Sequence, residues 1–288
     1  MIEAERTPPC GARREEKTMK QYLPTPAAAG ADGSFPATGL AAGQCAPCVL
    51  MPGDPHRSKI ISDLFRDAEF TAHRGTYATY TGHTPNGTAI GVTSSGMGCS
   101  CVATAMEELK AAGAETVIRV GTCGGVQPWM QPGRLVIASG CVRGEGASYE
   151  IVPPEFPAVA DPLVVAALMQ AAQEAGEDAL VGLYRSHDSF YMESKAAHPG
   201  LRERMQKWID TNVLVVENES GMLFTYGHLL GLRTGTICVA LGSMFADSAQ
   251  EAPEVYGAYA DPEFLANRVK AASRVAIRAA EILEEVAK

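Results

Sequence analysis

The chain has 288 residues, of which 46% are hydrophobic and 20% are charged, as in a globular protein with a substantial core. Its formal net charge of -9 at pH 7 argues against nucleic acid as a partner, because broad nucleic-acid binding needs a basic face. No apolar run reaches the roughly 20 residues of a membrane-spanning helix, so we expect no membrane partner either.

Residues 1–43 differ in composition from the rest of the chain. They begin charged and become rich in Pro, Ala and Gly, which predicts a poorly ordered N-terminal arm. The first 20 residues lack the apolar segment of a secretory signal. The eight cysteines show no disulfide-framework spacing, which indicates reduced thiols and a cytoplasmic protein. Cys45 and Cys48 form a single CxxC pair, which we interpret as core residues, with a redox pair as the alternative.

Strands and helices alternate along residues 44–288, which we interpret as one catalytic domain. Short apolar or alternating runs predict strands over residues 45–51, 68–74, 76–81, 88–95, 117–120, 133–143, 179–183, 213–216 and 234–241. Helical spacing predicts helices over residues 55–65, 100–112, 162–175, 200–210 and 220–230, and from 262 onward. This alternation predicts an α/β fold, a single-domain three-layer sandwich with a twisted, mostly parallel central sheet flanked by helices.

The first predicted helix begins with a clear signal. Asp54 can cap its N-terminus and Pro55 suits its first position. Arg57 lies in the first turn and adds positive charge at a helix N-terminus, which is a potential anion site. Far along the chain, residues 242–257 are polar and irregular, and we interpret them as a mobile lid.

Residues 117–125, Val-Ile-Arg-Val-Gly-Thr-Cys-Gly-Gly, place Arg119 inside an apolar strand that is followed by a glycine-rich turn. Burying an unpaired guanidinium is costly, so its charge should meet an anion or a buried carboxylate. Glycines allow the turn to present backbone N–H groups and the Thr122 hydroxyl to the same anion. The stretch alone therefore leaves two hypotheses open: a phosphate site, or a buried salt bridge beside an ordinary turn.

Polar residues follow four of the predicted strands, at residues 53–57, 119–122, 185–191 and 217–219. In open α/β sheets the ligand binds beyond the carboxyl ends of the strands, so these clusters should share one site. Glu217 and Glu219 alternate, so only one of them should face that site if the strand geometry continues through Glu219. Such a carboxylate could bind a vicinal diol, act as a base or cap the following helix.

Several segments resemble nucleoside phosphorylases. Three family signatures are matched in order by residues 51–57 (MPGDPHR), 119–124 (RVGTCG) and 216–220 (VENES). The uridine phosphorylase branch in particular is similar at residues 145–148, 155–161 and 188–191. The resemblance covers about residues 45–245 and implies reversible phosphorolysis of a nucleoside to ribose 1-phosphate and free base.

The resemblance also implies roles for individual residues. The phosphate ligands would be Gly53, Arg57, Arg119 and Thr122, joined by Arg74 from the neighbouring subunit. Glu219 would hold the ribose hydroxyls beside Asn218, which stands where the family usually has methionine, and Phe190 would lie against the base. Arg119 and Glu219 are the expected catalytic residues. Inorganic phosphate is the co-substrate, no cofactor or metal is expected, and the minimal active unit is a homodimer, which the family usually assembles into hexamers.

The base pocket departs from the family pattern. The Gln and Arg that read uracil are absent after Phe190-Tyr191, and the purine branch's Asp is replaced by Gly242-Ser243. Substitutes could come from the charged residues Lys195, His187, Arg185, Arg202 and Arg204. We expect a phosphorylase of uridine or a related pyrimidine nucleoside, because the flanking motifs resemble the uridine phosphorylase branch. The alternatives are a purine or modified-nucleoside phosphorylase, a hydrolytic nucleosidase, and a non-catalytic nucleoside- or phosphate-binding homologue.

Overall fold

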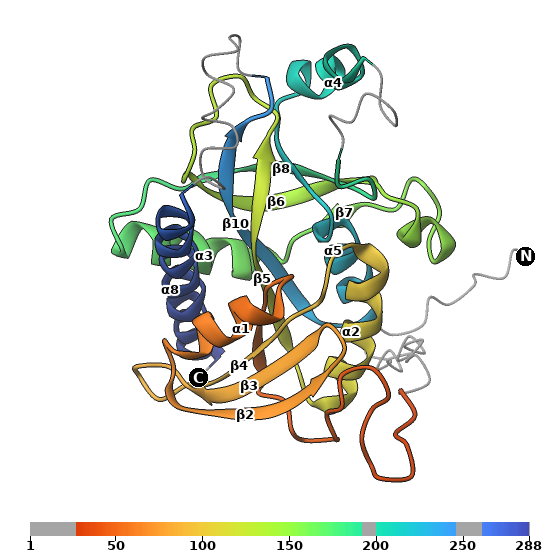
Figure 1. Ribbon diagram of the computed structural model, residues 1–288, viewed down its shortest axis with the longest axis vertical. Coiled ribbons are helices and arrows are strands. Elements are labelled where there is room, and N and C mark those ends of the chain that lie inside the picture. The colour runs from red at the N-terminus through yellow and green to blue at the C-terminus, as the bar shows by residue number, and fades with distance from the viewer. Residues whose placement is uncertain (1–26, 192–199, 246–260, 288) are drawn as a thin grey trace, which may run out of the picture.

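A computed structural model describes residues 27–191, 200–245 and 261–287 (Figure 1). The strands are β1 (Cys48–Met51), β2 (Arg66–Arg74), β3 (Tyr77–His83), β4 (Ala89–Thr93), β5 (Thr116–Gly125), β6 (Leu135–Gly144), β7 (Ala158–Val159), β8 (Leu180–His187), β9 (Val213–Glu217) and β10 (Arg233–Ser243). The helices are α1 (Pro55–Ser62), α2 (Cys99–Ala112), α3 (Pro162–Glu174), α4 (Leu201–Asp210), α5 (Ser220–Leu230) and α8 (Pro262–Ala287), with a 3-10 turn at Ala147–Glu150. Each strand and helix expected from the sequence has its counterpart, whereas most of the expected lid lies outside the described residues.

One ten-stranded sheet has the order β10-β6-β8-β9-β5-β1-β4-β3-β2, with β7 beside β6. Because β10 also pairs with β5, the strands β5, β9, β8, β6 and β10 form a closed ring. Five pairs are parallel and five are antiparallel. The α/β class is confirmed, but the sheet is mixed rather than mostly parallel. The three-layer description is not confirmed, since part of the sheet closes on itself.

The glycine-rich stretch after Arg119 is part of strand β5, not the turn that the sequence suggested. Gly124 and Gly125 pair antiparallel with Val216 and Val215 of β9. A Cβ at Gly125 would lie 2.6 Å from the Gly242 carbonyl oxygen. These glycines therefore allow close packing of neighbouring backbones rather than a change of direction.

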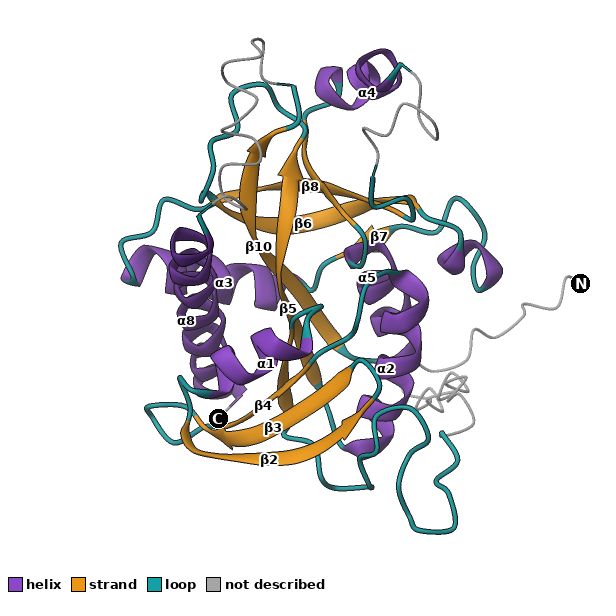
Figure 2. Cartoon of the chain, in the orientation of Figure 1, coloured by secondary structure: helices purple, strands orange, loops and turns teal. Residues whose placement is uncertain are grey.

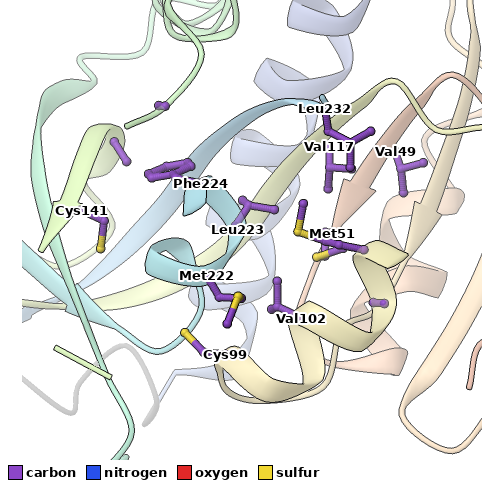
Figure 3. Packing of buried hydrophobic residues seen from close by; sticks show 14 of the residues in the cluster. Val49, Met51, Cys99, Val102, Val117, Cys141, Met222, Leu223, Phe224 and Leu232 are labelled. Carbon is purple, nitrogen blue, oxygen red and sulfur yellow. The ribbon is translucent and has the colours of Figure 1, made fainter. Parts of the chain in front are cut away.

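Helices cover two sides of the sheet (Figure 2). Helices α1, α3 and α8 contribute Ile61, Leu168 and Ile282 to one apolar cluster. Helices α2 and α5 contribute Val102 and Phe224 to a second cluster, which Figure 3 shows closing over the strands. Each helix buries its apolar side chains against the sheet, and this burial fixes the position of the helix, because the hydrophobic effect dominates packing.

Part of the predicted arm, around residues 34–41, is packed against the rest of the chain. Leu40 is fully buried. The Glu108 carboxylate of α2 accepts hydrogen bonds from the backbone N–H groups of Ala37 (2.9 Å) and Thr38 (2.6 Å). The packed part of the chain thus begins before residue 44, while residues 1–26 lie outside the described residues.

Burial raises the pKa of both Cys45 and Cys48 to about 12, which supports their interpretation as core thiols rather than a redox pair. The cysteines in the described ranges are all free. No helix in those same ranges is long and apolar enough to cross a membrane. They also contain no cluster of three or more His, Cys, Asp or Glu side chains suited to a metal ion.

Candidate functional site

Arg119 lies at the centre of a buried cluster of charges, and its side chain is 5% exposed. Its Nε donates to Glu217 Oε2 at 2.9 Å, and its Nη2 lies 2.6 Å from Glu219 Oε2. Its Nη1 is buried and has no hydrogen-bond partner among the described residues. The buried salt bridge that the sequence left as one alternative is therefore present, and one nitrogen of the same guanidinium has no acceptor from the described residues.

The surrounding carboxylates fix the charge of this guanidinium. Burial lowers the pKa of Arg119, but the charges of Glu219 and Glu217 outweigh burial and raise this pKa above its ordinary value. Arg119 therefore stays cationic. Its unpartnered Nη1 is a donor that has lost water without gaining a protein acceptor, which is costly unless a ligand supplies one.

Glu217 joins Arg119 to the start of α5. One carboxylate oxygen accepts from Ser186 Oγ at 2.5 Å, and the other accepts from the backbone N–H of Glu219 at 2.9 Å. Both oxygens also accept from the Ser220 N–H. Glu217 thus satisfies N–H groups at the start of α5, which would otherwise lack partners. Ser186 is a member of the site that the sequence did not single out, because a serine near a strand end carries no distinguishing signal.

Glu219 also contacts Arg119, so both glutamates meet the same guanidinium, and the strand geometry on which the expected alternation depended does not continue. The chain leaves extended geometry after Glu217, and Glu219 has a ψ angle of -32°, so strand alternation no longer applies. Its side chain makes no capping bond to α5, which excludes the helix-cap alternative. Its Oε1 instead accepts from the Gly98 N–H at 2.6 Å. Burial raises the pKa of Glu219, and Arg119 opposes this effect.

Arg57 and Thr122 lie on the α1 side of the site. Arg57 Nη1 donates to Thr122 Oγ1 at 3.4 Å. The α1 start has the predicted form, since Asp54 accepts from the His56 N–H and Pro55 is the first helical residue.

The turn at Gly53 connects α1 to the Glu219 side of the site. The Gly53 carbonyl oxygen accepts from the Gly96 N–H at 2.9 Å, and two residues later Gly98 donates to Glu219. Met51, just before the turn, is in register with Arg119. The structure therefore contains two groups of contacts, Arg57 with Thr122 and Arg119 with Glu219, and the paired turns at Gly53 and Gly96 lie between α1 and Gly98, which bonds to Glu219.

Three predicted residues have other surroundings. Arg74 is exposed on β2 and its Nη1 donates to the carbonyl oxygens of Phe35 and Pro36, each at 3.1 Å. Phe190 is 51% exposed and its ring meets that of Tyr191 edge to face, so it is not part of the core. Asn218 Nδ2 donates to the His187 carbonyl oxygen, which connects the ends of β9 and β8.

A model of the Phosphorylase superfamily matches residues 47–288. The uridine phosphorylase of Treponema pallidum (strain Nichols) is 40% identical over 209 residues, which are 71% of this chain and 81% of that protein. The guanosine phosphorylase of Halorubrum lacusprofundi is 37% identical over 215 residues, which are 71% of this chain and 84% of that protein. The crystal structure of a uridine phosphorylase from Vibrio fischeri ES114 has a TM-score of 0.76 at 28% identity and covers 86% of this chain and 98% of its own.

Proposed function

The chain belongs to the phosphorylase superfamily, and we propose that it catalyses reversible phosphorolysis of a nucleoside to ribose 1-phosphate and free base in nucleoside salvage. Uridine or a related pyrimidine nucleoside is the proposed substrate, because uridine phosphorylases recur among the relatives. The observation that carries the proposal is the buried Arg119, whose Nη1 lacks a protein partner while Glu219 lies 2.6 Å from its Nη2. This arrangement supports binding of an oxyanion by Arg119 and of the sugar hydroxyls by Glu219.

In the proposed reaction, Gly53, Arg57, Arg119 and Thr122 hold inorganic phosphate beneath the ribose. Guanidinium and backbone N–H groups match phosphate oxygens in geometry and charge. The glycosidic C1′–N bond breaks and its electron pair leaves with the base, while a phosphate oxygen forms the new bond to C1′. The bound phosphate dianion stabilises the positive charge that develops on the sugar, so positioning and electrostatics supply most of the rate and no cofactor is required.

Glu219 is the proposed ribose ligand, next to Asn218. A carboxylate can accept hydrogen bonds from two vicinal hydroxyls and hold the ring as the glycosidic bond lengthens. Phe190, near the carboxyl end of β8, is the proposed aromatic face for the base, a role that its exposed ring allows.

We further propose that residues 44–288 form the catalytic domain, that residues 1–43 are an arm, and that a cytoplasmic homodimer is the minimal active unit, with hexamers as a larger assembly. The free cysteines of the described ranges support a reducing compartment. Arg74 is the proposed contribution to the neighbour's phosphate site, since it is an arginine on an exposed strand.

The guanosine phosphorylase relative favours a second candidate, a purine nucleoside phosphorylase. The experiment is release of base from uridine, guanosine and inosine by the full chain, with and without inorganic phosphate. We expect base release only with phosphate, together with formation of ribose 1-phosphate. Undiminished release without phosphate would identify a hydrolase. Absence of turnover on the whole panel, with phosphate still bound, would identify a non-catalytic homologue.

Substitution of Arg119 tests the site itself. Arg119→Ala should remove on the order of 3 kcal/mol of transition-state stabilisation. This loss corresponds to a fall in kcat/KM of about a hundredfold. Arg274→Ala on the exposed face of α8 is the matched control and should change nothing. Near-normal phosphorolysis by Arg119→Ala would show that the phosphate assignment is wrong.

A further inference from the structure

Strand β8 carries two neighbouring side chains whose buried polar atoms have no partner. Nε and Nη1 of Arg185 and Nδ1 of His187 are buried without a hydrogen-bond partner among the residues that the structure describes. His187 is 7% exposed, so it has given up water almost completely. Buried polar groups are normally satisfied, so three such atoms within three residues are candidate ligand contacts.

The two side chains lie on one face of β8. Tyr184 and Ser186 bond on the other face, to the Val136 carbonyl oxygen and to Glu217. Alternation along the strand therefore directs Arg185 and His187 away from them together. Arg185 faces α4, where its Cζ lies 5.3 Å from the centre of the Trp208 ring.

A glycine brings the guanidinium next to the histidine. A Cβ at Gly144 would lie 2.7 Å from Arg185 Nη2 and 2.8 Å from its Cζ, so the guanidinium rests against this residue. Gly144 is the partner of His187 in the pairing of β6 with β8. The donors of Arg185 and the ring of His187 therefore lie side by side.

The end of β8 lies next to the proposed sugar site. Arg185 is in register with Val216 of β9, and Ser186 is in register with Glu217. The Asn218 side chain donates to the His187 carbonyl oxygen, and the next residue is Glu219. The Arg185–His187 pair is therefore connected to Glu219 through Asn218.

The protonation of His187 defines what the pair can bind. Burial, followed by the charge of Arg185, lowers the pKa of His187 to about 4, so the ring is neutral near pH 7. A neutral imidazole has one N–H donor and one acceptor nitrogen, and Nδ1 is the nitrogen that lacks a partner among the described residues.

We propose that Arg185 and His187 read the base of the nucleoside by its lactam edge, a proposal that rests on the proposed phosphorolysis. Arg185 donates to a ring carbonyl oxygen, and His187 Nδ1 accepts from the adjacent ring N–H. Uracil and the 6-oxopurines present this carbonyl and N–H side by side. Cytosine and adenine present an amino donor beside a ring nitrogen acceptor, which is the reverse pattern. The pair thus takes over the task of the missing uracil-reading Gln and Arg and selects oxo-bases of either ring size.

The test compares kcat/KM for uridine and inosine with kcat/KM for cytidine and adenosine. The wild-type protein should prefer each oxo-nucleoside to its amino counterpart by at least about 100-fold, because a site built to bond a polar group rejects an analogue that leaves it unpaired. Arg185→Met and His187→Phe should each reduce this ratio about 10- to 100-fold. Arg185→Lys keeps a donor, so its preference for oxo-nucleosides should lie between that of Arg185→Met and that of the wild-type protein.

Arg274→Met and His83→Phe repeat two of these changes at exposed positions and should keep the wild-type ratio. A wild-type ratio below about threefold, or variants that fold and keep the wild-type ratio, would overturn the inference while leaving phosphorolysis intact. Calorimetric binding of free uracil, hypoxanthine, cytosine and adenine separates the two proposals. The wild-type protein could bind uracil and hypoxanthine selectively, and Arg185→Met and His187→Phe could lose this selectivity, while no nucleoside is turned over. That result would support the inference and reject the proposed function.

Discussion

Two arginines are positioned by glycines that leave room for their guanidinium groups. Arg119 lies along its own strand over Gly121, where a Cβ would be 2.7 Å from Nη2, and Arg185 lies in the same way against Gly144. Glycine here serves close approach rather than unusual backbone angles. Each guanidinium thereby has one orientation, which is what recognition of an oxyanion or a lactam edge requires.

Gly121→Ala tests whether this fit matters for activity. The added methyl group would meet the far end of the flexible Arg119 side chain, with Cys238 Sγ as the next neighbour at 3.0 Å. Arg119 should shift while the strand stays in place, and kcat/KM should fall at least about tenfold, since small misplacements of a positioning group are costly. Steady-state phosphorolysis measures the effect. Gly91→Ala is the control, because its Cβ would have no contact closer than 3.6 Å. Equal activity of the two variants would contradict the argument.

His187 should leave a signature in the pH dependence of stability. Its pKa is lowered from 6.5 to about 4 by burial and by Arg185, so between these values the unfolded chain binds more protons than the folded one. The free energy of unfolding should therefore fall as pH falls through this window, by about 3 kcal/mol in total.

Urea unfolding from neutral pH to about pH 4.5 measures this effect, with the wild-type protein and His187→Gln compared at each pH. The variant should lose stability less steeply than the wild-type protein, because it lacks the titrating ring. His83→Gln, at an exposed position on β3, should follow the wild-type curve. Superimposable curves for wild type and His187→Gln would show that His187 is not held neutral by its surroundings.

At the scale of the elements, two helices begin with the same Asp-Pro signal but have different relations to the site. Asp54 accepts one N–H at the start of α1, and Asp161 accepts two at the start of α3. Only α1 carries a predicted phosphate ligand, Arg57 in its first turn. Loss of either cap should therefore affect stability, whereas only loss of the α1 cap should also affect the position of a phosphate ligand.

Asp54→Ala and Asp161→Ala should each lower the free energy of unfolding by about 1 kcal/mol, the usual effect of losing an N-cap. Asp54→Ala should in addition raise the KM for phosphate several-fold, because the first turn of α1 would fray around Arg57. Chemical denaturation and phosphate titration at saturating nucleoside measure the two effects. A matching rise in KM for Asp161→Ala would mean that the effect is general loss of stability.

These elements also show where sequence reasoning succeeds and where it ends. Local signals such as Asp54-Pro55 and the left-handed Gly113 after α2 predict helix ends, because the groups involved are neighbours in the chain. The continuation of β5 through Gly124 and Gly125 depends on β9, some ninety positions away, and a glycine-rich run by itself is equally typical of a turn. Pairing partners and strand directions are long-range facts that apolar periodicity does not contain.

At the scale of the whole molecule, the candidate site is assembled from segments near residues 53–57, 96–98, 119–122 and 217–219, which the sheet brings together. The motifs named residues in three of these four segments. They did not predict that Glu217 and Glu219 share Arg119, or that Arg185 and His187 lack partners. Those facts depend on how several strand ends meet in space, and no one segment of the sequence determines them.

Arg74 is the proposed point at which two copies of the chain complete each other's site. Within one chain it is exposed and contacts Phe35 and Pro36, and none of its described contacts involves Arg119 or Glu219. If it serves the partner's phosphate, Arg74→Ala and Arg119→Ala damage different sites of a mixed dimer. One site would then lack both arginines and the other would be intact.

Mixing the two inactive variants should therefore restore activity. Random exchange of equal amounts makes about half of the dimers mixed, each with one intact site, so about a quarter of wild-type activity should return. The control pairs Arg57→Ala with Arg119→Ala. Both of these residues serve the site of their own chain, so every site keeps a defect and no activity should return. If Arg74 only fastens residues 34–36 within its own chain, the first mixture will stay as inactive as the second, and the site will be complete within one chain.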